Sequence, residues 1–195
     1  MARSDQALNG GVIDDRPPEP LGQCSGIDAF RQPQAHDQSL VDRLARIEQL
    51  FLDHAMAEHR DFRLLEQNYV ASGGELATIH GADKNIGSEA LSGFMYHAAS
   101  KPDPLGLLGA MFIIEGLGSR LAGPWAKLVE EQLGLREEAI SFFKYHGEND
   151  EHHMEEFDRA IELAATDEAT SNAIVKHAKV VARLYRLQLE ELDHV

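Results

Sequence analysis

The placement of proline constrains the fold of this chain more than any other feature of its sequence. Four of the seven prolines lie before residue 35, and after Pro33 the chain has only Pro102, Pro104 and Pro124. Proline interrupts helices and central strands, so the long stretches without it are open to regular structure. Apolar residues in these stretches recur at three- and four-residue steps, and no segment shows the strict alternation of a half-buried strand. The sequence therefore predicts an all-α protein built as a helical bundle.

The helices can be placed from the apolar pattern and from breaking residues. We expect the first helix over residues 37–70, with an apolar stripe of Leu44, Ile47, Phe51, Phe62, Leu65 and Tyr69. The Ser72-Gly73-Gly74 sequence ends this helix. Further helices are predicted over residues 88–99, 105–132, 136–165 and 168–195. The helix over 105–132 is expected to bend near Pro124.

Composition narrows the class of protein. Residues 1–35 show no sustained apolar period, so we expect a flexible tail there and one folded domain over residues 36–195. The formal net charge of -15 disfavours nucleic acid and anionic membrane surfaces as partners. The single cysteine, Cys24, excludes an internal disulfide and suits a reducing cytoplasm, which is the expected location.

The strongest functional signal lies in the helix predicted over residues 136–165. At about 100° per residue, one face of this helix carries Phe143, His146, Asp150, His153, Phe157 and Ile161. Two histidines and an aspartate thus occupy the middle of a stripe that should be buried. A buried carboxylate without a partner is costly, and a metal ion would pair with it while using neutral imidazoles as ligands. The alternative is a solvated polar helix, because acidic residues crowd the same segment.

A second signal is Glu115, which lies in the most apolar stretch of the chain, residues 107–118. A lone charge buried there would cost several kcal/mol. The interpretation as a metal ligand competes with a structural ion pair, for which Arg120 is the candidate partner.

The first helix supplies a weaker signal. Glu58 falls near the middle of its apolar stripe, and His54 lies on the flank one turn away. His59 and Glu66 are further candidates from the same helix, and the sequence leaves the choice among the four open.

Together, the predicted metal ligands are His54, Glu58, Glu115, His146, Asp150 and His153. Carboxylates and imidazoles that project inward from bundle helices are the ligands of di-iron helical proteins. The chain has no cysteine cluster for structural zinc or an iron–sulfur centre. A mononuclear iron site with two histidines and one carboxylate is the alternative.

The motif His146-x3-Asp150-x2-His153, with Glu115 on the preceding core helix, resembles the metal-binding signature of the heme-oxygenase-like di-iron oxidases and oxygenases. This family stands beside the heme oxygenases, the thiaminase-like (TENA) proteins and the pyrroloquinoline-quinone synthase. The resemblance covers residues 37–165 and implies a heme-oxygenase-like fold. The family also takes a Glu-x6-His pair from its first core helix, which this sequence lacks.

The resemblance implies an iron-dependent oxidoreductase that uses two iron ions, O2 and an electron donor to oxidise a small organic substrate. Glu115 and Asp150 would be its catalytic residues. A homodimer is one possible assembly. Two rivals share the fold: a cofactor-free TENA-like hydrolase or binding protein, which lacks a core cysteine as nucleophile, and a heme-binding heme-oxygenase relative. A third rival is a non-enzymatic helical partner module.

Overall fold

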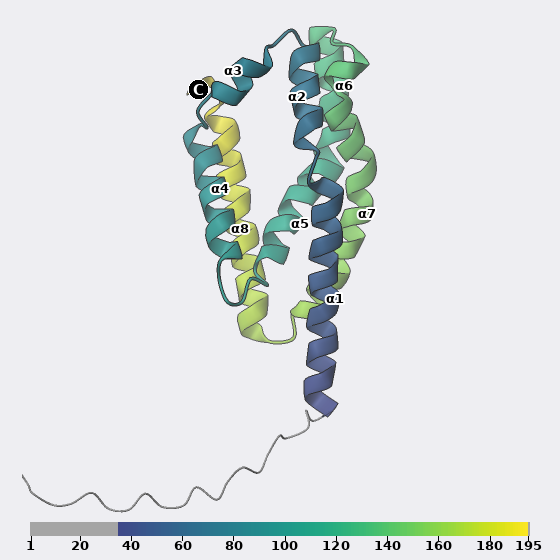
Figure 1. The fold of residues 1–195 in the computed structure, drawn as a ribbon, viewed down its shortest axis with the longest axis vertical. Coiled ribbons are helices and arrows are strands. Elements are labelled where there is room, and N and C mark those ends of the chain that lie inside the picture. Colours follow the sequence, from purple (N-terminus) through teal and green to yellow (C-terminus); the bar gives the residue numbers. More distant parts are fainter. Residues whose placement is uncertain (1–34, 195) are drawn as a thin grey trace, which may run out of the picture. The chain divides into compact units, whose positions relative to one another are not determined.

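A computed structural model of the chain describes residues 35–194, without the side chains of residues 35–37, 151 and 194. These residues form helices joined by short connections, and no strand occurs among them (Figure 1). The α-helices are α1 (Ala35–Glu58), α2 (Phe62–Ala71), α3 (Leu76–Gly81), α4 (Ile86–Ala99), α5 (Leu107–Leu117), α6 (Gly123–Leu133), α7 (Ser141–Ala164) and α8 (Glu168–Glu190). The predicted all-α class is confirmed. Most of the predicted tail, with Cys24, lies outside the described residues.

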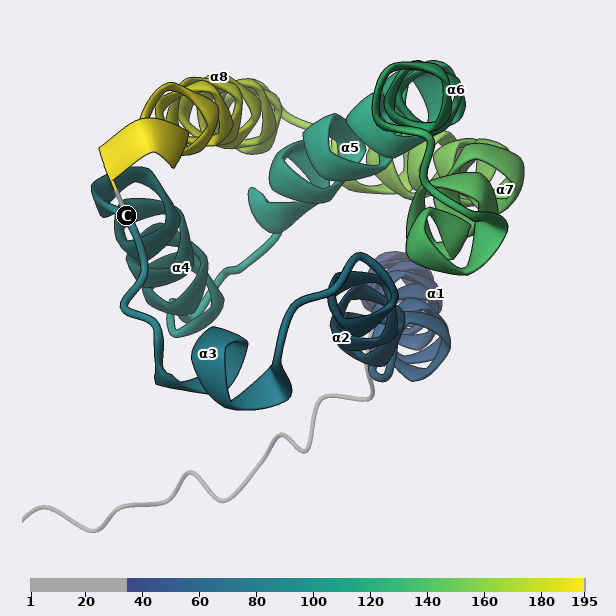
Figure 2. The same ribbon diagram turned by 90° about the horizontal axis from the view of Figure 1, so that it is seen from above.

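Helix α5 occupies the centre of the bundle. It packs against α8 on one side and against α7 on the other, while α1 contacts α7 and α4 contacts α8. Seen from above, α1 and α2 stand next to α7, and α4 stands next to α8 (Figure 2). Helix α7 therefore contacts both α1 and α5, and residues on these three helices can come together.

The core explains why α5 takes the central position. Leu108 on α5 and Phe157 on α7 are almost completely buried, and Ile174 on α8 packs in the same cluster. Burying a side chain of this kind contributes about 1.5–3 kcal/mol. Gly109 lets α5 approach the backbone of α8 closely, because a Cβ at this position would collide with the carbonyl oxygen of Ile174.

The first predicted helix is wrong in one respect: it is two helices, interrupted at residues 59–61. The ring of His59 donates a hydrogen bond from Nδ1 to the carbonyl oxygen of Met56 (2.7 Å), and Asp61 N donates to Glu58 O (3.1 Å) in a tighter turn. Side-chain bonds of this kind compete with the regular helical ladder. The apolar period continues across the turn, so the break leaves no trace in the hydrophobic pattern.

Other boundaries also differ from the prediction. The helix expected over 105–132 contains a π-helical turn at Gly118–Ala122, so its irregularity lies before Pro124, which occupies the first turn of α6. The helix expected from residue 136 begins at Ser141, after a 3-10 turn at Glu137–Ala139. The short helix α3 was not predicted. No helix among residues 35–194 has the length and apolar character that crossing a membrane requires.

Candidate metal centre

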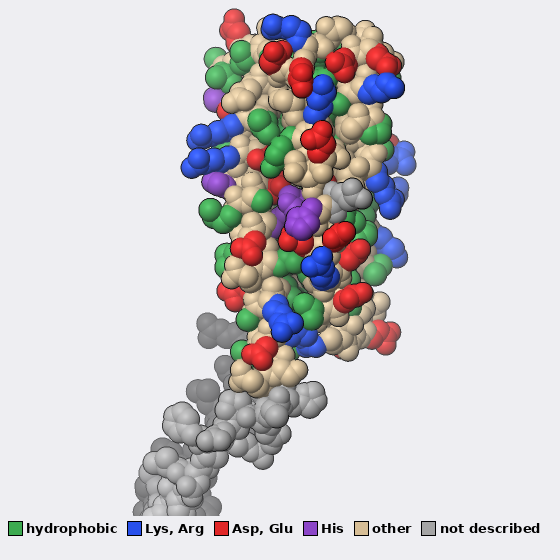
Figure 3. All heavy atoms as spheres, turned by 90° about the vertical axis from the view of Figure 1, so that its right-hand side faces the viewer, with side chains coloured by type: hydrophobic (Ala, Val, Ile, Leu, Met, Phe, Trp, Pro, Cys, Tyr) green, Lys and Arg blue, Asp and Glu red, His purple; other side chains and the backbone are tan. Residues whose placement is uncertain are grey.

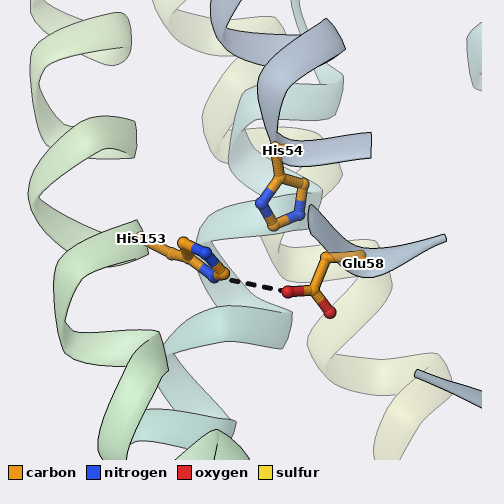
Figure 4. Close-up of side chains that lie close together, drawn as sticks. All are labelled: His54, Glu58 and His153. Atoms are coloured by element: carbon orange, nitrogen blue, oxygen red, sulfur yellow. Dashed lines mark ion pairs between the residues drawn. The ribbon is translucent and has the colours of Figure 1, made fainter. Parts of the chain in front are cut away.

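All six predicted ligands come together between α1, α5 and α7, and a seventh residue, Asp61, joins them. The donor atoms form three overlapping groups, in each of which all atoms lie within 4.8 Å of one another. The groups are His54, Glu58 and His153; Glu58, Asp61 and His146; and Glu115, Asp150 and His153. Figure 4 shows the first group, in which the three side chains point toward one another. Glu58 and His153 each belong to two groups, so the cluster is continuous.

One end of the cluster is organised around Glu115. Its Oε1 lies 3.4 Å from His54 Nε2, and its Oε2 accepts a hydrogen bond from His153 Nδ1 at 3.2 Å. The side chain of Glu115 is only 5% exposed. We call His54, Glu115 and His153 the Glu115 end.

The other end is organised around His146, whose two ring nitrogens face different carboxylates. Nδ1 donates a hydrogen bond to Asp150 Oδ1 at 2.9 Å, and Nε2 lies 3.5 Å from Asp61 Oδ2. We call Asp61 and His146 the Asp61 end. Two carboxylates connect the ends: Glu58 Oε1 lies 3.6 Å from His153 Nδ1, and Asp150 shares a group with Glu115.

Asp61 is the residue that the sequence analysis missed. The sequence nevertheless contains a pattern that points to Asp61. The spacing His54-x3-Glu58-x2-Asp61 is the same as that of His146-x3-Asp150-x2-His153. Asp61 keeps helical backbone angles (φ -68°, ψ -22°), so this spacing still places its side chain near that of Glu58 although α1 has ended.

The other candidates lie outside the cluster. His59 is exposed and bonded to its own turn, and Glu66 on α2 pairs with His80 on α3 at 2.5 Å. Arg120, the proposed structural partner of Glu115, is exposed. The polar contacts recorded for Glu115 are with His54 and His153, which rules out the arginine alternative.

Several buried polar atoms of the cluster lack a hydrogen-bond partner. They are both ring nitrogens of His54, Glu58 Oε1, Asp61 Oδ2 and His146 Nε2. A buried polar atom without a partner costs about 1–3 kcal/mol. A cation between the carboxylates and the imidazoles would satisfy these atoms together, and oxygen and imidazole donors suit iron. The donor set therefore fits a metal ion.

The electrostatics of the cluster shift its titrations. Burial opposes ionisation of Glu115, but the adjacent His54 and His153 outweigh it and hold the pKa of Glu115 below its usual value. Burial disfavours charged imidazoles, yet the contact of His54 with Glu115 and that of His146 with Asp150 raise the pKa of both histidines. Burial, Glu115 and Asp61 raise the pKa of Glu58. Without a metal, His54, His146 and Glu58 thus bind protons more tightly than the free groups do, whereas Glu115 binds its proton less tightly.

The π-helical turn after α5 determines how closely Asp150 can approach that helix. Gly118 begins this turn, and a Cβ on Gly118 would overlap Asp150 Oδ2. Gly147 makes a similar close approach, since its Cβ would stand 2.9 Å from the backbone nitrogen of Gly123. The absence of side chains at these glycines lets α7 bring His146 and Asp150 against the end of α5.

A cavity of about 300 Å³ adjoins the cluster. Its polar lining includes Glu58, Asp61, Glu115, His146 and Asp150, and most of the remaining wall is apolar or aromatic. The aromatic residues of that wall are Phe62, Trp125, Phe142, Phe143 and Tyr185. A larger cavity of about 690 Å³ lies between α1, the α4–α5 connection and the start of α8, but none of the clustered residues lines it. Of these two cavities, the smaller one is therefore in reach of the candidate ligands.

Comparison with known families matches residues 31–186 to the family described as iron-containing redox enzyme. No curated protein and no solved structure matches the chain. The matched range spans most of the chain and includes every residue of the cluster. The all-α bundle is consistent with the heme-oxygenase-like fold that the motif resemblance predicted. The chain belongs to the family of iron-containing redox enzymes, within the heme-oxygenase-like superfamily.

Proposed function

We propose that this chain binds two iron ions in the cluster and activates O2 to oxidise a small organic substrate. The observation that carries the proposal is the convergence of three imidazoles and four carboxylates on one buried region next to a cavity. A single iron ion takes up to six ligands, so seven candidate donors in overlapping groups suit two ions better than one.

The two ends of the cluster supply the two metal positions in this proposal. His54, Glu115 and His153 would hold one ion, and Asp61 and His146 would hold the other. Glu58 and Asp150, which lie between the ends, would add carboxylate ligands. Asp150 also orients the ring of His146 through Nδ1, which leaves Nε2 turned toward Asp61.

Bound ferrous iron would supply the electrons that reduce O2, a reaction that side chains cannot perform. The protein supplies the environment of that reaction. Phe142 packs against the ring of His146 with 4.3 Å between the ring centroids, and Trp125 and Phe143 meet edge to face at 6.2 Å. This aromatic wall limits water at the cluster and favours a substrate with an apolar body.

The size of the cavity adds a restriction on the substrate. A volume of about 300 Å³ lies at the lower end of the range for small-molecule sites. Among the described residues no lysine or arginine lines it, so recognition of a substrate anion would fall to the metal ions themselves. A compact, mostly apolar substrate fits this site best.

Two adjacent histidines on α7 allow a matched test. His153 belongs to the cluster, whereas His152 is 71% exposed and pairs with Glu156. The full chain, loaded anaerobically with ferrous iron, should consume O2 and show a transient visible absorption band in stopped-flow experiments. We expect His153→Ala to abolish both signals and His152→Ala to retain them. Equal O2 consumption by both variants and the parent would contradict the proposal.

A further inference from the structure

The exposed face of α8 carries a charge opposite to that of the whole chain. Acidic residues outnumber lysine and arginine by 33 to 18 in the sequence. Between residues 171 and 189, α8 nevertheless has no acidic residue, and it carries Lys176, Lys179, Arg183 and Arg186, all of them exposed. Their spacing of three and four residues places them along one side of the helix. We call these four residues the α8 cation stripe.

Three members of the stripe carry unneutralised charge. Arg186 pairs with Glu190 at 2.6 Å, but among the described residues no carboxylate lies within ion-pair distance of Lys176, Lys179 or Arg183. Several exposed cations elsewhere do have an acidic partner, as Lys127 has Glu131 and Arg159 has Glu155. Acidic and basic side chains are also interspersed on the face shown in Figure 3. The stripe is thus a local positive field on an acidic protein.

The surface between these cations is partly apolar. Val175 is 50% exposed, and Val180 and Leu184 line the same shallow depression on α8 as Lys176, Lys179 and Arg183. Exposed apolar side chains framed by charge are typical of surfaces at which proteins meet.

The inner face of the same helix reaches the cavity beside the cluster. Tyr185, two residues after Arg183, lines this cavity together with Glu58 and Glu115. An α-helix is about 10 Å across with its side chains. A partner on the outer face of α8 would therefore stand one helix thickness from the cavity of the candidate metal centre.

We propose that the α8 cation stripe is the docking site for an acidic one-electron carrier protein. This inference rests on the proposed function, because an iron centre that reduces O2 must be returned to the ferrous state. Each docked carrier would lose one electron, and one ferric ion would become ferrous, with no bond made or broken. The rest of the acidic surface repels such a carrier, so the stripe attracts it and selects its orientation.

The probe for this test is an acidic [2Fe–2S] ferredoxin, and its dissociation constant is measured with the full chain, metal-free and iron-loaded. The triple variant Lys176→Glu, Lys179→Glu, Arg183→Glu removes the stripe. The matched control is Lys101→Glu, Lys127→Glu, Arg136→Glu, which makes the same change of charge at exposed positions elsewhere. We expect the stripe variant to weaken binding at least about tenfold more than the control, and added salt to weaken binding to the parent.

Several results would overturn the docking site. Equal weakening by both triple variants would show that only net charge matters. Failure of the parent to bind ferredoxin, with stripe-dependent binding to phosphatidylglycerol vesicles or duplex DNA, would assign the stripe to another partner. Iron content measured on the same preparations separates the two proposals. Normal iron binding without ferredoxin binding contradicts the docking site alone, and stripe-dependent ferredoxin binding without any iron binding contradicts the metal centre alone.

Discussion

At the Glu115 end of the cluster every side chain projects from a regular stretch of helix, whereas at the Asp61 end one carboxylate comes from the turn between α1 and α2. The ends also differ in depth, since the side chain of Glu115 is 5% exposed and that of Asp61 is 16% exposed. The Glu115 end is thus held by helix packing, and the Asp61 end depends on a local irregularity. We therefore expect changes outside the cluster to disturb iron binding less at the Glu115 end than at the Asp61 end. Loss of a ligand should reduce iron binding more at the Glu115 end.

The largest effect is expected for Glu115→Gln, which keeps the shape of the side chain but removes the anion between His54 and His153. Iron binding should fall to about one ion per chain or fewer, since both histidines of the Glu115 end lose their shared partner. At one hundred times Kd a metal stabilises its protein by about 2.7 kcal/mol, or about 5–10 °C of melting temperature for a chain of this size. Differential scanning calorimetry should show this shift for the parent and not for the variant.

The control for that prediction is Glu66→Gln, which removes a carboxylate paired with His80 outside the cluster. This variant should bind iron as the parent does. If Glu115→Gln bound iron and shifted its melting temperature to the same extent, Glu115 would be a structural residue and the Glu115 end would not be a metal position.

The next largest effect is expected for Gly118→Ala. The added Cβ would overlap Asp150 Oδ2, so the carboxylate must move or α7 must shift. Overpacking of this kind costs about 1–3 kcal/mol, and the displaced Asp150 should reduce the iron bound per chain. Gly116→Ala is the matched control, because its Cβ would meet only Met154 at an ordinary 3.6 Å. Equal iron content and melting temperature in the two variants would show that Asp150 does not depend on Gly118.

A smaller effect is expected for Asp61→Asn, which removes the carboxylate of the turn and leaves the Glu115 end intact. Iron content should fall from about two ions per chain to about one, with part of the thermal shift retained. Elemental analysis after removal of loose metal measures this. An iron content unchanged from that of the parent would mean that Asp61 is no ligand and that the two ends do not differ as described.

The smallest effect concerns pH in the metal-free protein. Contacts with Glu115 and Asp150 raise the pKa of His54 and His146 in the folded state, so the folded state binds their protons more tightly than the unfolded state. This stability is fully present below the unfolded pKa of about 6.5 and is lost as pH rises through the folded pKa values. The melting temperature of the metal-free protein should fall between about pH 6 and pH 8, and His54→Asn should weaken the dependence. A metal-free protein that melts higher at pH 8 would contradict these contacts.

The difference between the two ends also shows which candidate ligands can be predicted from the sequence. His146, Asp150 and His153 lie on one face of a regular helix, and Glu115 lies in an apolar run, so periodicity and burial cost were enough to select them. The apolar period continues through residues 59–61, where the helix does not, so the pattern predicted one helix and left Asp61 unnoticed. The π-helical turn at Gly118–Ala122 was missed for a similar reason, because the apolar pattern of residues 105–132 continues through it.

The apolar stripe of the first predicted helix also shows a limit of prediction from the sequence. Ile47 is buried as expected, but Leu44 and Phe62 are 42% and 55% exposed. Leu44 and Phe51 line the cavity of about 690 Å³, and Phe62 lines the cavity beside the cluster. An apolar stripe indicates which face turns inward, and it does not indicate whether that face meets another helix or a cavity.

If the two ends together hold two metal ions, an anaerobic titration of the full chain with ferrous iron should reveal both positions. We expect saturation at about two ions per chain at micromolar concentrations, with Asp61→Asn saturating at about one. The cluster would then be a two-metal centre in which the turn after α1 supplies the second position. Saturation of the parent at one ion, or no binding at all, would show that the cluster is not a two-metal centre.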